Sequence, residues 1–279
     1  MSRLDVVAHP ALRPLAVTVA GALFSVPLYV VVADAFKPGA EIAPSPASLP
    51  IPPTLDNLTA VMTRSDRLFW VSLTNSLLVT SLSVAILIVL SAMLGHYLAR
   101  TGSRWGRVAT IVLLSGLMIP TQVILLPITQ VLGTLHLMAT VQGLILFNVG
   151  YYVPFGVFVF AGFVRTVPLE LEQAAALDGA GWFTTFWRVV FPLLRPATAS
   201  SAIFLGVWIW NDFLNPLIIL GPSTGTTITT GIYRAIGQYQ ADFGTVFGLM
   251  FLATLPVLAL YLALQSQFVK GLTGGAAKG

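Results

Sequence analysis

Long stretches without a charged side chain dominate this sequence. Residues 14–33 carry no charge, residues 68–99 form an uncharged run of 32, and residues 108–164 form one of 57. An α-helix rises about 1.5 Å per residue, so about 20 apolar residues cross the hydrocarbon core of a bilayer. Only 9% of the chain is charged, against roughly 25% in soluble domains. We therefore expect a membrane protein.

The uncharged runs divide into six expected transmembrane helices. Their ranges are 14–33, 68–99, two helices within 108–164 joined by a turn near 133–140, one at the start of 196–233 before the polar stretch 221–230, and 243–269. Pro120, Pro127 and Pro154 should kink the third and fourth helices, because proline removes a helical hydrogen bond. The predicted fold class is an all-α membrane protein.

Basic residues predict the orientation of these helices. With the N-terminus inside, ten of the 14 Lys and Arg residues lie on the cytoplasmic side and four on the external side. Cytoplasmic loops are enriched in Lys and Arg, so we predict an N-in, C-in topology. The expected parts are a tail and first helix (1–36), a Pro-rich external loop (37–70), a five-helix core (71–266) with a cytoplasmic loop at 165–196, and a cytoplasmic tail (267–279).

Three segments outside the membrane core carry further expectations. Ala33-Asp34-Ala35 follows an apolar run and resembles a signal-peptidase site, but the run is long for a signal peptide, so we expect an uncleaved helix. Six prolines within 37–67 predict an extended strap without a regular helix. Residues 271–279 are rich in Gly and Ala and show no pattern of their own.

Several kinds of chemistry lack the residues that they need. No lysine follows a glycine, so the phosphate-binding motif G-x-x-x-x-G-K-[ST] is absent. The three histidines are scattered and the chain has no cysteine, which argues against a metal site, a disulfide and a thiol nucleophile. The sequence has no basic face with interleaved aromatic residues, so it does not predict nucleic-acid binding. We predict no enzymatic activity, no catalytic residue, no metal and no cofactor.

The cytoplasmic loop 165–196 contains an unusual short helix. Pro168 suits a helix start, and Glu170 and Glu172 lie at the positive end of the helix dipole. Asp178-Gly179 predicts the helix stop. One face carries Leu169, Gln173, Ala176 and Leu177.

The loop has two interpretations. A second amphipathic piece, Trp182–Val190, fits a helix lying on the membrane surface. The first piece is acidic and rich in alanine, so it gains little from an anionic surface. Its small side chains favour docking into a groove of another protein.

The loop resembles the EAA loop of ATP-binding-cassette (ABC) importer permeases, in which a coupling helix docks on a cytoplasmic ATPase. The resemblance rests on Leu-Glu-Gln-Ala-Ala-Ala-Leu-Asp-Gly-Ala and the later Pro192. Further stretches resemble the carbohydrate-uptake (maltose-type) permeases, in particular the smaller MalG-like subunit. These are Asn75-Ser76, Met118-Ile-Pro-Thr-Gln-Val, Trp210-Asn-Asp-Phe and the ending from Phe268. The resemblance implies coupling residues Glu172, Gln173, Ala174, Ala175, Asp178, Gly179, Ala180 and Pro192.

One residue departs from the family pattern. The family usually has glutamate directly before the two alanines, where this chain has Gln173 preceded by Glu172. Glutamine keeps the helix but not the carboxylate. Glu172 is a substitute whose side chain points about 100° away around the helix.

Polar residues inside apolar runs are candidates for the transport path. Asp212 is the one carboxylate deep in such a run, where a charge costs about 2.5–3.5 kcal/mol on insertion scales. Trp208 and Trp210 carry rings suited to stacking on a sugar, although tryptophan also anchors helices at membrane interfaces. Our candidate set is Asn75, Asn148, Tyr151, Trp210, Asn211, Asp212 and Asn215. Helix-to-helix hydrogen bonding or ion pairing is the structural alternative for the polar members, and equally for Tyr152.

The resemblance implies a complex in the bacterial or archaeal cytoplasmic membrane. Its members would be this chain, a second permease, two cytoplasmic ATPase subunits and an external solute-binding protein. Each ATP-driven closure of the ATPase pair would move the EAA helix. The alternatives are an ion-driven secondary transporter, which would need more intramembrane ionisable residues than Asp212, and a membrane scaffold, which leaves the loop unexplained.

Overall fold

The structure is a computed structural model, and it describes residues 12–221, 225–238 and 242–276. Every regular element in these ranges is a helix, which confirms the all-α prediction there. Four helices are long and apolar enough to cross a membrane, or up to six if each of two bent helix pairs is one span. The chain forms two compact units, residues 1–67 with 232–254 and residues 68–231 with 255–279, and each is described by itself.

The first unit is organised around one asparagine side chain. Its helices are α1 (Leu12–Ala35), α2 (Gly39–Ile42), α3 (Asp56–Thr63), most of α14 (Ile228–Gln238) and the beginning of α15 (Phe243–Ala276). The buried amide of Asn57 donates hydrogen bonds to the backbone oxygens of Asp34, Ala35 and Lys37, at 3.3, 3.1 and 2.8 Å. These bonds satisfy carbonyl groups that the end of α1 leaves unpaired.

A buried ion pair closes the same region. Lys37 Nζ lies 2.6 Å from Asp34 Oδ1 and donates to the Ser45 backbone oxygen at 2.6 Å, and both charged side chains are fully buried. Ala33, Asp34 and Ala35 therefore lie in the buried last turn of α1.

The prediction that residues 37–67 form a strap without a regular helix is wrong. It contains the four-residue α2 and the eight-residue α3. No proline lies within either helix, since Pro38 precedes α2 and the last proline, Pro53, precedes α3. The prolines therefore restrict helix formation to the gaps between them.

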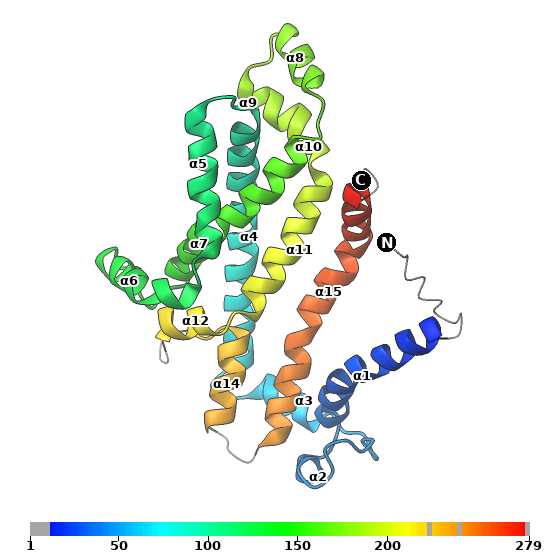
Figure 1. The fold of residues 1–279 in the computed structure, drawn as a ribbon. Helices are drawn as coiled ribbons and strands as arrows, with labels where there is room; N and C mark the ends of the chain where they lie inside the picture. The colour runs from blue at the N-terminus through cyan, green and yellow to red at the C-terminus, as the bar shows by residue number, and fades with distance from the viewer. Residues whose placement is uncertain (1–11, 222–224, 239–241, 277–279) are drawn as a thin grey trace, which may run out of the picture. The chain divides into compact units, whose positions relative to one another are not determined.

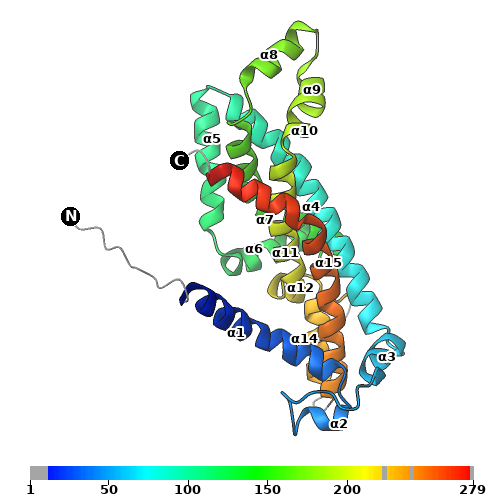
Figure 2. The same cartoon turned by 90° about the vertical axis from the view of Figure 1, so that its right-hand side faces the viewer.

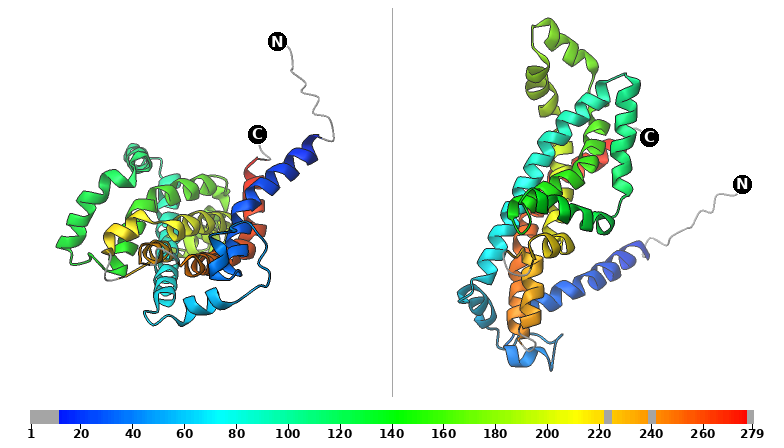
Figure 3. Two further views of the ribbon diagram at one scale, coloured as in Figure 1. Left: turned by 90° about the horizontal axis from the view of Figure 1, so that it is seen from below. Right: turned by 90° about the vertical axis from the view of Figure 1, so that its left-hand side faces the viewer.

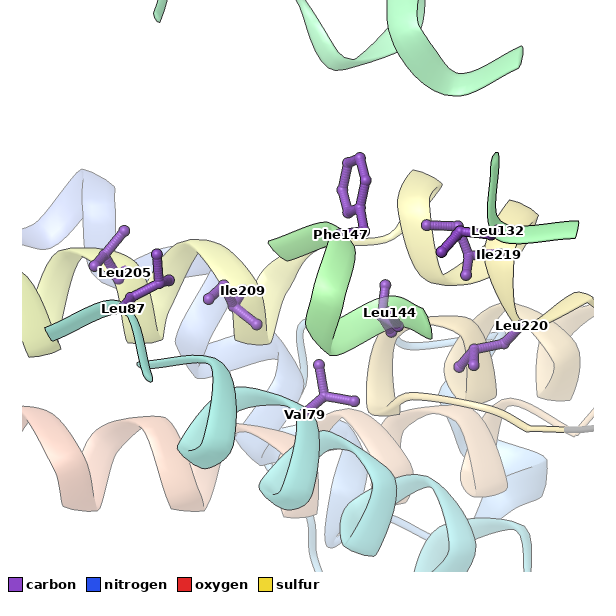
Figure 4. Close-up of a cluster of buried hydrophobic side chains, with 9 residues drawn as sticks. All are labelled: Val79, Leu87, Leu132, Leu144, Phe147, Leu205, Ile209, Ile219 and Leu220. Carbon is purple, nitrogen blue, oxygen red and sulfur yellow. The ribbon is translucent and has the colours of Figure 1, made fainter. Parts of the chain in front are cut away.

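The second unit is a bundle built on α4 (Leu68–Arg100), α7 (Val141–Val164) and α11 (Arg195–Asn211), which pack together (Figure 1, Figure 2). Figure 4 shows the main hydrophobic cluster, to which these helices, α6 and α12 contribute. Its buried members are Val79, Leu87, Leu132, Leu144, Phe147, Leu205, Ile209, Ile219 and Leu220.

Glycine allows α4 and α7 to approach closely. A Cβ atom at Gly95 would lie 3.0 Å from the Ala161 backbone nitrogen, and one at Gly156 would lie 2.1 Å from Ser91 Oγ. Small residues at helix contacts are typical of membrane proteins, where close packing drives association.

We expect Gly156→Ala to destabilise the bundle, because the added methyl overlaps Ser91. Overpacking costs about 1–3 kcal/mol, so the thermal unfolding midpoint of the detergent-solubilised chain should fall. Gly162→Ala on the same helix meets no atom within 4 Å and is the matched control. Adding Ser91→Gly should restore the midpoint of Gly156→Ala, and failure to do so would exclude this contact as the cause.

The chain bends sharply at two places, and the first lies within the expected third span. Helix α5 (Arg104–Ser115) and the short η1 (Gly116–Met118) meet α6 (Thr121–Thr134) at 104° (Figure 3). The break falls at Ile119-Pro120, as the kink predicted at Pro120 requires. Pro127 and Pro154 instead lie inside α6 and α7.

The second bend precedes α11. Helices α9 (Trp182–Thr185), η2 (Phe186–Val190) and α10 (Phe191–Leu193) meet α11 at 75°. Beyond α11 the chain forms α12 (Leu214–Ile219) and α14 (Ile228–Gln238).

Two predicted boundaries are wrong. The span expected from residue 196 ends at Asn211, and part of the predicted polar stretch 221–230 begins α14. Helix α15 continues to Ala276, through most of the 271–279 segment in which no pattern was found.

Candidate functional site

The predicted helix of the 165–196 loop is α8 (Leu169–Leu177). Pro168 lies at its N-cap, and Glu170 and Glu172 lie in its first turn, as predicted. Gly179 has φ +81° and follows the helix end. Its N–H donates to Ala176 O at 3.0 Å, and Ala180 N–H donates to Ala175 O at 2.9 Å. This is a Schellman ending, which requires a left-handed residue that glycine adopts without strain.

One face of α8 is not covered by any of the residues that the structure describes. No residue of α8 is buried, and Leu177 is 90% exposed. Leu169, Gln173 and Ala176, which share the predicted face with Leu177, are also exposed. Glu172 and Ala175 are the half-buried residues of the helix. A large apolar side chain this exposed marks an interaction surface when it lies in a contiguous patch.

The acidic residue beside Gln173 faces the chain's own bundle. Glu172 Oε1 accepts a hydrogen bond from Arg100 Nε at 2.8 Å, and Glu172 Oε2 accepts one from His96 Nε2 at 2.9 Å. Arg100 Nη2 also donates to Val167 O at 2.8 Å. Both basic residues lie on the last turns of α4.

The second piece of the loop is anchored in the bundle. Phe186 and Val190 are fully buried in a cluster with Ala92 and Phe160, whereas Trp182 and Phe183 are at least half exposed. The interpretation of Trp182–Val190 as a helix resting on the membrane surface is therefore wrong for its Phe186–Val190 side. Asp178, Gly179 and Pro192 are exposed, and Ala180 is half-buried.

A second candidate site is a cavity of about 480 Å³ in the second unit. Residues from η1, α6, α7, α11 and α12 line it. They are Leu117, Thr121, Tyr151, Tyr152, Phe155, Val207, Trp208, Asn211, Asp212 and Asn215. Aromatic rings beside amide and carboxylate groups are suited to polar organic solutes, because they combine apolar contact with hydrogen bonding.

Asp212 lies at a helix break, which corrects its expected position deep in one span. It is the extended residue between α11 and α12, with ψ 130°. Asp212 Oδ2 accepts a hydrogen bond from Asn215 Nδ2 at 2.7 Å, and the Asp212 backbone oxygen accepts one from Thr229 Oγ1 at 2.6 Å. Asp212 Oδ1 also accepts a hydrogen bond from the Asn215 backbone N–H at 3.4 Å, so the carboxylate caps the first turn of α12.

Aromatic side chains form one wall of the cavity. The ring of Trp208 stacks on Tyr152 with centroids 6.0 Å apart and lies 4.8 Å from Phe155. Tyr151 donates to the Ile119 backbone oxygen at 3.2 Å, across the break between η1 and α6. Asn211 Nδ2 donates within its own helix to Val207 O at 2.9 Å.

The structure brings together four of the seven predicted path residues. Tyr151, Asn211, Asp212 and Asn215 line the cavity, whereas Trp210 is buried and lines a separate, mainly apolar cavity. Asn75 donates to Thr226 O at 3.1 Å, and Asn148 is buried away from both cavities. The Asn75 contact fits the structural alternative, whereas the buried Asn148 Oδ1 has no hydrogen-bond partner among the described residues.

Three aromatic residues of the cavity are missing from the predicted set. Trp208 precedes Asn211 by three residues and Asp212 by four, and this helical spacing could have identified it. Tyr152 and Phe155 have the same i, i+3 or i+4 relation along α7, but their side chains are common in membrane helices and carry no distinct signal.

Comparisons with known proteins identify the family. Residues 87–272 match the family described as "Binding-protein-dependent transport system inner membrane component". The multiple sugar-binding transport system permease protein MsmG of Streptococcus mutans is 33% identical over 94% of both chains. The melibiose/raffinose/stachyose import permease protein MelC of Bacillus subtilis is 33% identical over 75% of this chain and 76% of its own.

A solved structure shares the fold. It is that of a bacterial ABC transporter involved in the import of the acidic polysaccharide alginate, with a TM-score of 0.80 and 17% identity over 96% of this chain and 99% of that chain. The matched family covers more than half of the sequence. The chain therefore belongs to the inner membrane components of binding-protein-dependent transport systems, and it is a multi-pass transport permease, not an enzyme.

Proposed function

We propose that this chain forms half of the pathway through which an ABC importer moves a sugar or related polar solute. The exposed face of α8 is the observation that carries the proposal. A capped helix with a 90% exposed leucine, and no buried residue of its own, presents a ready docking surface. The relatives named as sugar permeases favour a sugar as the solute.

The proposal includes a membrane topology for the chain. Its 165–196 loop faces the cytoplasm, its 37–70 loop faces outward, and both termini are cytoplasmic with six spans between them. Two ATPase subunits bind on the inside, a second permease completes the pathway, and an external solute-binding protein delivers the solute. ATP-driven closure of the ATPase pair moves α8.

The cavity is the part of the pathway that this chain supplies. Its stacked Trp208 and Tyr152 offer apolar ring surface for a sugar, and Asn211 is exposed beside them. Asn215 Oδ1 is buried and has no hydrogen-bond partner among the described residues, which leaves an acceptor in the wall. Because buried polar atoms normally find a partner, a solute hydroxyl or water is expected to supply it.

A pull-down from detergent-solubilised membranes tests the proposal. The wild type should co-purify with an ATPase subunit, and a variant with Ala174–Gly179 replaced by a Gly/Ser linker should not. The same replacement at residues 44–49, in the predicted external loop, is the control and should retain the subunit. Absence of any ATPase from the wild-type sample would overturn the proposal and favour an ion-driven transporter or a scaffold.

A further inference from the structure

The only polar side-chain link between α8 and the bundle, within the described chain, is Glu172. Its two carboxylate oxygens bind different residues of α4, with Oε1 on Arg100 and Oε2 on His96. Among the described residues, no other residue of α8 makes a side-chain hydrogen bond or an ion pair. Helix α8 also packs against α9 and η2.

Burial and shared hydrogen bonds hold the side chains of this link in place. His96 is buried and its ring packs against Phe186 and Trp182, with centroids 5.4 and 6.0 Å apart. Arg100 bridges from Glu172 to the backbone oxygen of Val167, which lies just before α8. Charge-assisted bonds that share partners and are shielded from water hold a fixed geometry better than exposed pairs do.

Helix α4 leads from this link to the cavity wall. It packs along α7, at contacts so close that Gly95 and Gly156 admit no larger residue without displacement of a neighbour. Tyr151, Tyr152 and Phe155 of α7 line the cavity. A displacement of α8 that is passed to the end of α4 therefore reaches the cavity through closely packed helices.

We propose that Arg100, His96 and Glu172 form a mechanical joint that transmits the movement of α8 to α4. The three are positioning residues: none touches the solute or the ATPase. Because Glu172 faces the bundle, the joint and the docking surface lie on different sides of α8. Gln173 and Leu177 are on the exposed side. This inference rests on the proposed docking of α8 on an ATPase.

The test measures coupling separately from assembly. Glu172→Ala and Arg100→Ala are reconstituted as complete complexes, and both solute uptake and ATP hydrolysis are recorded. We expect the ATPase subunit to stay bound while uptake per ATP hydrolysed falls about tenfold, within the usual range of coupling between distant sites. Glu170→Ala is the matched control, since Glu170 lies in the same first turn, is exposed and makes no ion pair among the described residues.

A rescue experiment distinguishes a joint from a general packing defect. The chain has no cysteine, so the double variant Arg100→Cys/Glu172→Cys carries the only thiols of this subunit. A bifunctional thiol reagent whose spacer matches the two lost side chains should restore uptake per ATP, and a monofunctional reagent should not. Restoration supports a mechanical link, because bridging restores no charge.

The contrary results are distinct. Unchanged uptake per ATP in Glu172→Ala and Arg100→Ala, or no recovery on bridging of a monodisperse complex, overturns the joint alone. Loss of the ATPase subunit from Glu172→Ala but not from Arg100→Ala makes Glu172 a docking contact and also overturns the joint. Absence of the ATPase subunit from the wild type overturns the joint together with the proposed function.

Discussion

Replacing Leu177 with aspartate is expected to release the ATPase subunit from the complex. Leu177 is the most exposed large apolar residue of α8 and lies beside the Schellman ending at Gly179. Burying an unpaired carboxylate in the interface costs about 3 kcal/mol or more, which lowers the affinity by about a hundredfold. The measurement is the amount of ATPase subunit that co-purifies with the tagged chain, at equal levels of inserted protein.

The matched control is Leu49→Asp, the same substitution at an exposed leucine of the predicted external loop. This control should leave ATPase binding unchanged. If Leu177→Asp retains the subunit at the level of Leu49→Asp, the exposed face of α8 is not the docking surface.

The second large effect is expected at the break between α11 and α12. Asp212→Ala removes the acceptor for the Asn215 amide and leaves that buried group unpaired. An unsatisfied buried donor costs about 1–3 kcal/mol, and a loss of about 2 kcal/mol corresponds to about a thirtyfold fall in uptake if the break must be ordered. Radiolabelled solute uptake into cells measures it.

Asp212→Asn separates the capping role from the charge. Asparagine also caps helices, so this variant should keep most of the uptake that Asp212→Ala loses. Thr198→Ala on α11 is the control, because Thr198 Oγ1 bonds to Leu194 O at the N-cap of that helix and Thr198 does not line the cavity. Equal loss in Asp212→Asn and Asp212→Ala would show that the negative charge, not the cap, is required.

The ends of α8 and α4 illustrate what the sequence can predict. Apolar run length identifies α4 because a run of this length in a chain with few charges has no other stable structure. Pro168 and Gly179 mark the ends of α8 to within two residues, since proline fixes its own φ and glycine permits the left-handed φ of the helix stop. The face of α8 follows from helical spacing alone.

Long-range contacts limit the prediction of the sites. Residues Glu172 and Arg100 are far apart in the sequence, and no local pattern relates them. Asp212 reads as a residue inside one apolar run because the break at Asn211 depends on the Asn215 amide and on Thr229, which is distant. Trp208 and Trp210 have nearly the same local context, and only the packing of α11 against α7 separates the cavity residue from the buried one.

The Asn57 and Lys37 interactions of the first unit have a consequence for association. Each proline in 37–67 removes backbone freedom from the segment, and the buried lysine and asparagine fasten both of its sides to the end of α1. Binding to a flexible surface is opposed by the conformational entropy that the surface loses when it becomes ordered. A protein that binds this segment therefore loses less conformational entropy than it would on a flexible loop, and fewer contacts are needed for the same affinity.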